Sequence, residues 1–235
     1  MAPSFQLLGP ILAGYILICD SRPWWRKALL AFIFAAATVA TIGPWIVRNY
    51  EVFGTLIPVS TNSGINLLLG NSENTRSNSG VDVNLDHYIS QTAHLNEVER
   101  SSAYKRFALD WVSSNPGEAA LLYVRKLVNY FNFRAEPVTI VTGTPAWKDW
   151  IMFFTYYPML LLAVARLMLV RLKPLSRAEW LFLTLYVANA FLAAIFFTRV
   201  RFRLPFDGLL AVLALTALGH IFERGEVGRL AERTS

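Results

Sequence analysis

Charged residues are scarce in this sequence: they make up 16% of its 235 residues, whereas hydrophobic residues make up 54%. An ordinary soluble domain has about 25% charged residues. Cys19 is the single cysteine, which excludes an internal disulfide. The three histidines are scattered and no cysteine or carboxylate cluster completes a ligand set, so we predict no metal site.

The hydrophobic residues are concentrated in long runs. Four runs, 28–47, 150–170, 180–198 and 204–222, contain few or no charges. Each is close to the roughly 20 residues that cross about 30 Å of hydrocarbon. A fifth apolar run, 5–19, is shorter. The sequence predicts an all-α polytopic membrane protein with about five transmembrane helices.

Lys and Arg in the short connections indicate the orientation. They cluster between the first two runs, between the third and fourth, and in the tail. Cytoplasmic connections carry such an excess. This predicts an N-terminus outside, a C-terminus inside and four parts: two transmembrane helices (1–47), an extracytoplasmic loop domain (48–149), three transmembrane helices (150–222) and a cytoplasmic tail (223–235).

The net charge of +6 reflects this topology. Residues 48–148 contain nine basic and nine acidic residues, so the rest of the chain accounts for the whole excess. Basic residues near membrane surfaces follow from topology, and we therefore predict no nucleic-acid partner.

The outer loop has two parts. Residues 48–94 are rich in Asn, Ser, Thr and Gly, with a β-like piece at 55–59 and irregular loop at 71–80. Apolar residues at helical spacing predict one helix over 96–114 and another over 118–133. Arg125 and Lys126 in the second suit a helix at the membrane surface. Packing on the membrane helices is the simpler role for both.

Three arginines depart from the expected excess of basic residues on the cytoplasmic side. Arg199, Arg201 and Arg203 lie in a short connection that the topology places outside. An extended segment would put all three guanidinium groups on one side, where they could hold the phosphate of a lipid-linked sugar. Binding of lipid headgroups, or pairing with acidic loop residues, is an equal alternative. Arg166, near a predicted cytoplasmic helix end, is expected to extend to the membrane surface.

The segment GPWIVRNYEVFGTLIPVSTNSGINLLLGN, within residues 42–71, resembles bacterial membrane glycosyltransferases of the GT-C type. More narrowly, it resembles family-39-like proteins, related to protein mannosyltransferases and aminoarabinose transferases. The motifs are P-W-x-x-R-N, F-G, G-x-N-L and G-N, followed by E-x-x-R with a later N-P, and R-F-R-L-P at 201–205. For this function we predict that Arg199, Arg201 and Arg203 hold the carrier phosphate and that Arg48, Asn49, Asn66 and Asn71 shape an outer-loop pocket.

The resemblance implies transfer of a sugar from a polyprenyl-phosphate carrier to an acceptor on the outer side of a bacterial plasma membrane. A general base would activate the acceptor hydroxyl, and a divalent metal is possible as cofactor. In such enzymes the Asp or Glu that acts as this base lies in the first outer loop of a larger bundle. No acidic residue precedes Asp20 here, so the chain resembles the C-terminal half and the catalytic residue stays unknown.

Two other functions remain open. The chain could be a non-catalytic membrane protein, either a pseudo-enzyme or the partner of a separate N-terminal half. It could also be a flippase or polymerase of surface glycans, which would need arginines deeper in the helices than those found here.

Overall fold

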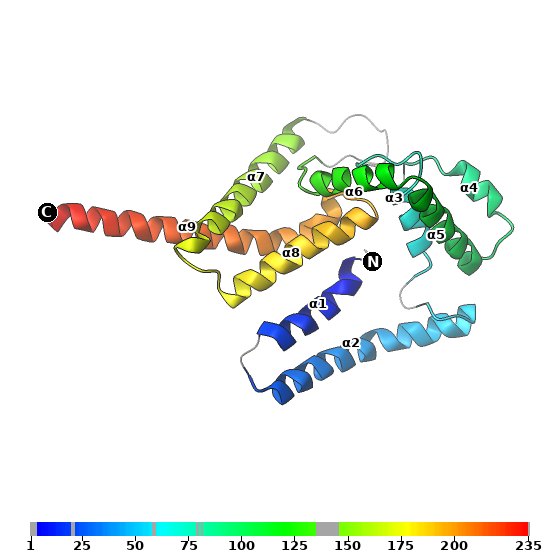
Figure 1. Cartoon of the computed structure of the whole chain (residues 1–235), viewed down its shortest axis with the longest axis horizontal. Coiled ribbons are helices and arrows are strands. Elements are labelled where there is room, and N and C mark those ends of the chain that lie inside the picture. The colour runs from blue at the N-terminus through cyan, green and yellow to red at the C-terminus, as the bar shows by residue number, and fades with distance from the viewer. Residues whose placement is uncertain are drawn as a thin grey trace. The chain divides into compact units, whose positions relative to one another are not determined.

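The computed structural model describes residues 4–19, 22–57, 60–78, 80, 82–134 and 146–234. Within these ranges the chain forms helices and no strand (Figure 1), which confirms the all-α class. Four of the described helices are long and apolar enough to cross a membrane. The protein is therefore a multi-pass membrane protein. The membrane segments are α2 (Trp24–Phe53), α7 (Ala146–Met168) with the 3-10 turn η1 (Leu169–Arg171), α8 (Arg177–Ile195) and the Val200–Phe222 part of α9 (Val200–Thr234).

The fifth expected membrane helix is shorter than the others. It is α1 (Ser4–Cys19), with 16 residues. At 1.5 Å per residue it is about 24 Å long, less than the roughly 30 Å of a bilayer core. It packs against α2, and Lys27 donates from Nζ to the carbonyl of Leu17 at 3.2 Å.

α2 continues further than the sequence indicated. The membrane helix was expected to end at Val47, but α2 runs through Pro44 and on to Phe53. It ends at Gly54, whose φ of 66° is left-handed, with the Gly54 N–H donating to the Tyr50 carbonyl. Glycine adopts this conformation without steric cost. Many large apolar side chains of α2 are exposed, including Phe32 (70%) and Val39 (62%), as contact with lipid requires.

The two helices predicted in the outer loop are present as α5 (Glu97–Ser114) and α6 (Pro116–Tyr130). A capping box starts α5: Asn96 accepts from the Glu99 N–H, and the Glu99 carboxylate accepts from the Asn96 N–H. Two short helices, α3 (Ser63–Gly70) and α4 (Asp86–Gln91), lie where the sequence was interpreted as loop. Residues 55–57 form no strand, and residues 58 and 59 of the β-like piece lie outside the described ranges.

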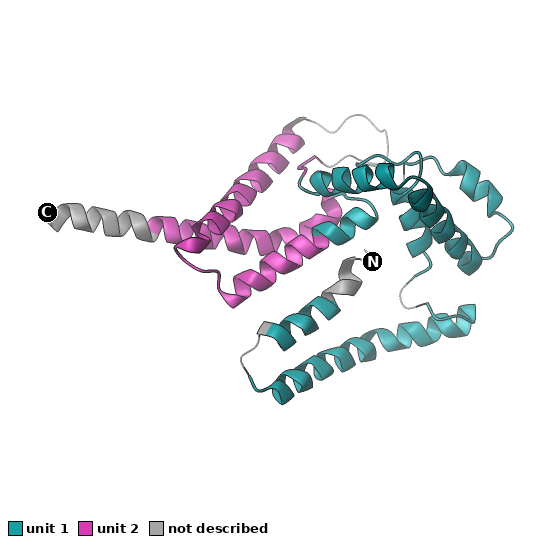
Figure 2. Cartoon of the chain, in the orientation of Figure 1, with its two compact units in different colours: residues 1–131, 190–199 teal, residues 132–189, 200–235 magenta. Residues whose placement is uncertain are grey.

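The chain divides into two compact units (Figure 2). Unit 1 comprises Met1–Phe131 and Ala190–Arg199, and unit 2 comprises Asn132–Asn189 and Val200–Ser235. In unit 1, α3 packs on α5. In unit 2, α7 packs on α9, and small buried residues such as Ala163 (3% exposed), Ala214 (4%) and Ala217 (0%) suit the close approach of membrane helices. The two units do not coincide with the four parts predicted from membrane topology. The end of α8, from Ala190 onward, belongs to unit 1 together with the helices of the outer loop.

Candidate functional site

The arginine-rich connection is mostly helical. α9 begins at Val200, so Arg201 and Arg203 lie in its first turn and the expectation of an extended segment is wrong. Residues two apart on a helix are separated by about 200°, so these two side chains leave the helix on different sides. The last apolar run was predicted over 204–222, but α9 begins four residues earlier, so Pro205 lies inside the helix. Arg199 precedes the helix and belongs to unit 1.

Arg203 is buried, with 1% of its surface exposed. Its Nε lies 3.1 and 3.2 Å from the two carboxylate oxygens of Asp207, one helical turn later. Its Nη1 donates to the Asn132 carbonyl at 2.8 Å, and its guanidinium carbon lies 3.4 Å from the centre of the Tyr156 ring. Breaking a buried ion pair leaves an uncompensated charge. The side chain therefore joins α7, α9 and the segment after α6 within unit 2.

Two tyrosines extend this buried cluster. The hydroxyls of Tyr156 (α7) and Tyr186 (α8) lie 3.0 Å apart, and both residues are at most 3% exposed. Our sequence interpretation missed them. The available signal was the presence of tyrosines within apolar helices, since a buried tyrosine hydroxyl usually has a hydrogen-bond partner.

Arg201 differs from Arg203 because it is exposed. Its guanidinium carbon lies 4.7 Å from the centre of the neighbouring Phe202 ring. Among the described residues it forms no ion pair with a carboxylate. At the same end of α7 and α9, Arg134 is also exposed (64% of its side chain) and lies 3.8 Å from an Asp149 oxygen. An exposed guanidinium at a helix start can approach an anionic group from the membrane surface.

Arg199 forms an ion pair within unit 1. Its Nη2 lies 2.8 Å from Oδ1 of Asp82, and its side chain is 12% exposed. The same Asp82 oxygen accepts from the Gly80 N–H at 2.7 Å. Arg199 therefore pairs with an acidic loop residue, which was one of the alternatives to phosphate binding in the sequence analysis.

Lys126 of α6 is completely buried, although the sequence suggested a place at the membrane surface. Its ammonium donates to the carbonyls of Gly70 and Phe196, both at 3.0 Å, and lies 3.3 Å from Oδ1 of Asn71 and 3.5 Å from the Ile195 carbonyl. Gly70 ends α3 and Ile195 ends α8. Lys126 thus satisfies carbonyls at two helix C-termini, where positive charge is favourable. Burial lowers the pKa of Lys126 to about 7.

Neighbouring side chains complete this arrangement, which we call the Lys126 clasp: Lys126, Asn71 and the carbonyls at the ends of α3 and α8. Asn71 donates from Nδ2 to the Leu67 carbonyl at 2.9 Å and the Ile195 carbonyl at 2.8 Å. Asn129 donates to the carbonyls of Ser77 (3.2 Å) and Thr198 (3.1 Å). The clasp ties the chain after α3 and the chain after α8 to α6.

The four residues expected to form an outer-loop pocket do not share one set of contacts. Only Asn71 belongs to the Lys126 clasp. Asn49 is buried and donates to the Ile57 carbonyl at 2.9 Å, which fixes the chain after α2. Arg48 is exposed, 5.1 Å from the Trp45 ring, and Asn66 is half-buried within α3.

No group of three or more His, Cys, Asp or Glu residues that could hold a metal ion is found in the described part of the chain. Comparison of the chain with models of protein families, with curated proteins and with solved structures finds no match. The likeness of the sequence motifs to glycosyltransferases therefore stays a prediction.

Proposed function

We propose that the chain is a membrane glycosyltransferase, or the C-terminal portion of one. It would transfer a sugar from a polyprenyl-phosphate carrier to an acceptor on the outer side of the bacterial plasma membrane. The exposed Arg201 in the first turn of a membrane-spanning helix carries the proposal. This position offers a cation where the phosphate of a membrane-bound carrier would lie.

The arginines have different parts in this proposal. Arg201 contacts the carrier phosphate, and the exposed Arg134 adds positive charge at the same end of α7 and α9. Arg203 is a positioning residue, because its guanidinium is held by Asp207 and Asn132 and fixes the first turn of α9. Arg199 is held by Asp82 and is not needed for phosphate contact.

The proposed reaction forms a bond between the acceptor oxygen and the anomeric carbon of the sugar. The bond from that carbon to the carrier phosphate oxygen breaks, and polyprenyl phosphate leaves with the bonding electrons. A general base takes the hydroxyl proton. No residue of this chain is assigned as that base. Arg201 would stabilise the charge that develops on the leaving phosphate, as fixed donors do when charge forms in a transition state.

The test is carrier binding by the full chain in lipid nanodiscs, with radiolabelled farnesyl phosphate as the probe. We expect Arg201→Gln to weaken binding about tenfold, the loss of one charge-assisted contact. Arg171→Gln is the matched control, because Arg171 is exposed at the other end of the α7 segment.

Folding is checked by thermal melting. Arg201→Gln should change the free energy of unfolding by less than about 0.5 kcal/mol, as exposed substitutions do. Arg203→Gln should cost about 3 kcal/mol, because it leaves Asp207 without its buried partner. Equal binding by wild type and Arg201→Gln would contradict the phosphate role. Binding without sugar transfer from a panel of polyprenyl-phosphate sugars would favour the non-catalytic partner.

A further inference from the structure

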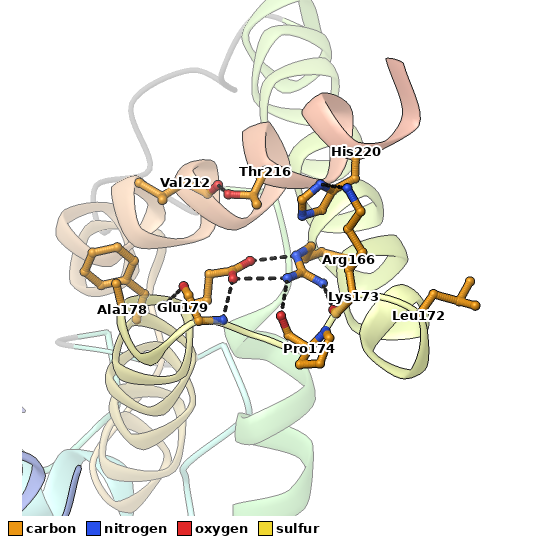
Figure 3. Close-up of a pocket in the computed structure, with 11 residues that line it drawn as sticks. Arg166, Leu172, Lys173, Pro174, Ala178, Glu179, Val212, Thr216 and His220 are labelled. Atoms are coloured by element: carbon orange, nitrogen blue, oxygen red, sulfur yellow. Dashed lines mark hydrogen bonds and ion pairs between the residues drawn. The ribbon is translucent and has the colours of Figure 1, made fainter. Parts of the chain in front are cut away.

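A cavity of about 570 Å³ lies in unit 2, at the opposite end of α7 and α9 from Arg201 (Figure 3). Its lining comes from the end of α7, the following connection, the start of α8 and the last part of the α9 membrane segment. Two membrane segments end here, at Arg171 and Phe222, and one begins at Arg177. The cavity is therefore at the level of one membrane surface, where lipid headgroups lie.

The base of the cavity is a buried ion pair. Arg166 is 1% exposed, and its Nε and Nη2 donate to the two carboxylate oxygens of Glu179 at 2.6 and 3.1 Å. Its other donors reach the carbonyls of Lys173 (2.9 Å) and Pro174 (3.2 Å). The expectation that Arg166 extends to the membrane surface is therefore wrong. The pair holds the connection from α7 to α8 in place.

Glu179 also starts α8. Its carboxylate accepts from the Ser176 N–H at 2.8 Å, and its own N–H donates to the Ser176 hydroxyl at 3.3 Å. This is a capping box. Among the described lining residues, Glu179 is the one with a carboxylate, and both of its oxygens are held by Arg166 or Ser176, so Arg166 compensates its negative charge.

The other charged and titratable groups among the described lining residues are basic. Lys173 Nζ lies 3.3 Å from Nδ1 of His220, and both side chains are half-buried. His220 follows Val212 and Thr216 at intervals of four residues, so the three form one stripe of α9 that faces the cavity (Figure 3). Basic side chains from two elements, the connection after α7 and α9, therefore lie together at the edge of the cavity.

Apolar side chains also line the cavity, together with Lys173 and His220. Leu172, Phe182 and Val212 line the cavity, and Leu172 and Val212 are also 61% and 40% exposed. In a membrane these exposed side chains contact acyl chains. The cavity combines a basic edge at headgroup level with an apolar wall, which are the two parts of a phospholipid site.

We propose that this cavity binds the phosphate group of an anionic phospholipid, with Lys173 and His220 at the phosphate and the apolar wall against an acyl chain. The site is independent of the proposed sugar transfer. The positive-inside rule, applied to Arg171, Lys173 and Arg177 in the connection, predicts that this end is cytoplasmic, where the leaflet is rich in anionic lipid. A soluble phosphate compound shares this chemistry, and the test separates the two sources.

The experiment is native mass spectrometry of the full chain in detergent, titrated with phosphatidylglycerol, phosphatidylcholine or inorganic phosphate. We expect one phosphatidylglycerol molecule to bind about tenfold more tightly than phosphatidylcholine. Lys173→Gln should remove about tenfold of this affinity, and His220→Gln a similar amount. Arg171→Gln is the control, because it removes the same charge from the same surface but lies outside the cavity lining.

A second variant leaves Lys173 and His220 unchanged. Val212→Trp places a large ring in the cavity from an exposed position of α9 and should abolish the tight binding. Equal phosphatidylglycerol binding by wild type, Lys173→Gln and Val212→Trp would overturn the proposal. An equal loss in Arg171→Gln would also overturn it, because the effect would then belong to the whole surface. Displacement of the lipid by millimolar inorganic phosphate would assign the cavity to a soluble phosphate instead.

Discussion

Three charged side chains, Lys126, Arg166 and Arg203, are among the largest that the protein buries completely. Different partners compensate the free-energy cost of burying each charge. Arg166 and Arg203 have carboxylate partners, Glu179 and Asp207. Lys126 is instead held by carbonyl and amide oxygens at helix ends. Burying a charge is costly unless such partners compensate.

Because the nearest partners of Lys126 are neutral oxygens, its protonation should affect stability near neutral pH. Burial lowers the pKa of Lys126 to about 7, whereas an unfolded lysine keeps a pKa near 10.5. Between these values the unfolded state binds more protons, so the free energy of unfolding rises with pH, by at most about 1.4 kcal/mol per pH unit. The measurement is thermal melting of the full chain in detergent at pH 7, 8 and 9.

The matched variants are Lys126→Met and Lys105→Met. Lys105 is exposed on α5 in the same unit, so its substitution should preserve the rise of melting temperature with pH. Lys126→Met should remove it. A rise that persists in Lys126→Met would mean that another group causes it.

At the scale of elements, α3 depends on a close approach to the chain after α8. A Cβ on Gly70 would lie 1.8 Å from the Phe196 carbonyl oxygen, which is backbone and cannot turn away. Gly70 also offers its carbonyl to Lys126. Because Gly70 has no side chain, its backbone can lie close to that of Phe196. The carbonyls of both residues then accept from the Lys126 ammonium.

We therefore expect Gly70→Ala to destabilise the protein by about 2 kcal/mol or more, the cost of forcing extra atoms into a packed site. Gly117→Ala is the control, since a Cβ there meets nothing within 4 Å and alanine favours a helix. Chemical denaturation followed by circular dichroism compares the two. Equal stability of the two variants would show that the approach at Gly70 is not required.

At the scale of the whole molecule, the positive-inside pattern predicts on which side each segment lies. The α3–α6 region should be outside, and the connection between α7 and α8 inside. In a Cys19→Ser background, we expect Ser113→Cys to react with a membrane-impermeant maleimide in intact cells. Arg171→Cys should react only after the cells are opened. Both positions are exposed, so accessibility within the protein does not decide the outcome. The reverse pattern would invert the topology and place Arg201 on the cytoplasmic side.

The helical class, four of the expected membrane segments and the helices α5 and α6 followed from the sequence alone, because they depend on local composition and periodicity. Runs of apolar residues near the length of a bilayer leave few alternatives to helices. The Asn96 and Glu99 capping box and Pro116 mark the starts of α5 and α6 by local hydrogen bonds and backbone geometry.

The environments of the charged side chains were decided only by the tertiary structure. From the sequence we predicted the same phosphate-binding role for Arg199, Arg201 and Arg203. We also predicted that Lys126 and Arg166 lie at the membrane surface. In the folded chain, Arg203 and Lys126 bond with residues 71 and 56 positions away in sequence, and Arg166 bonds with Glu179. Local periodicity carries no information on contacts over such separations. Burial and pairing of a charge depend on which distant segments the fold brings beside it.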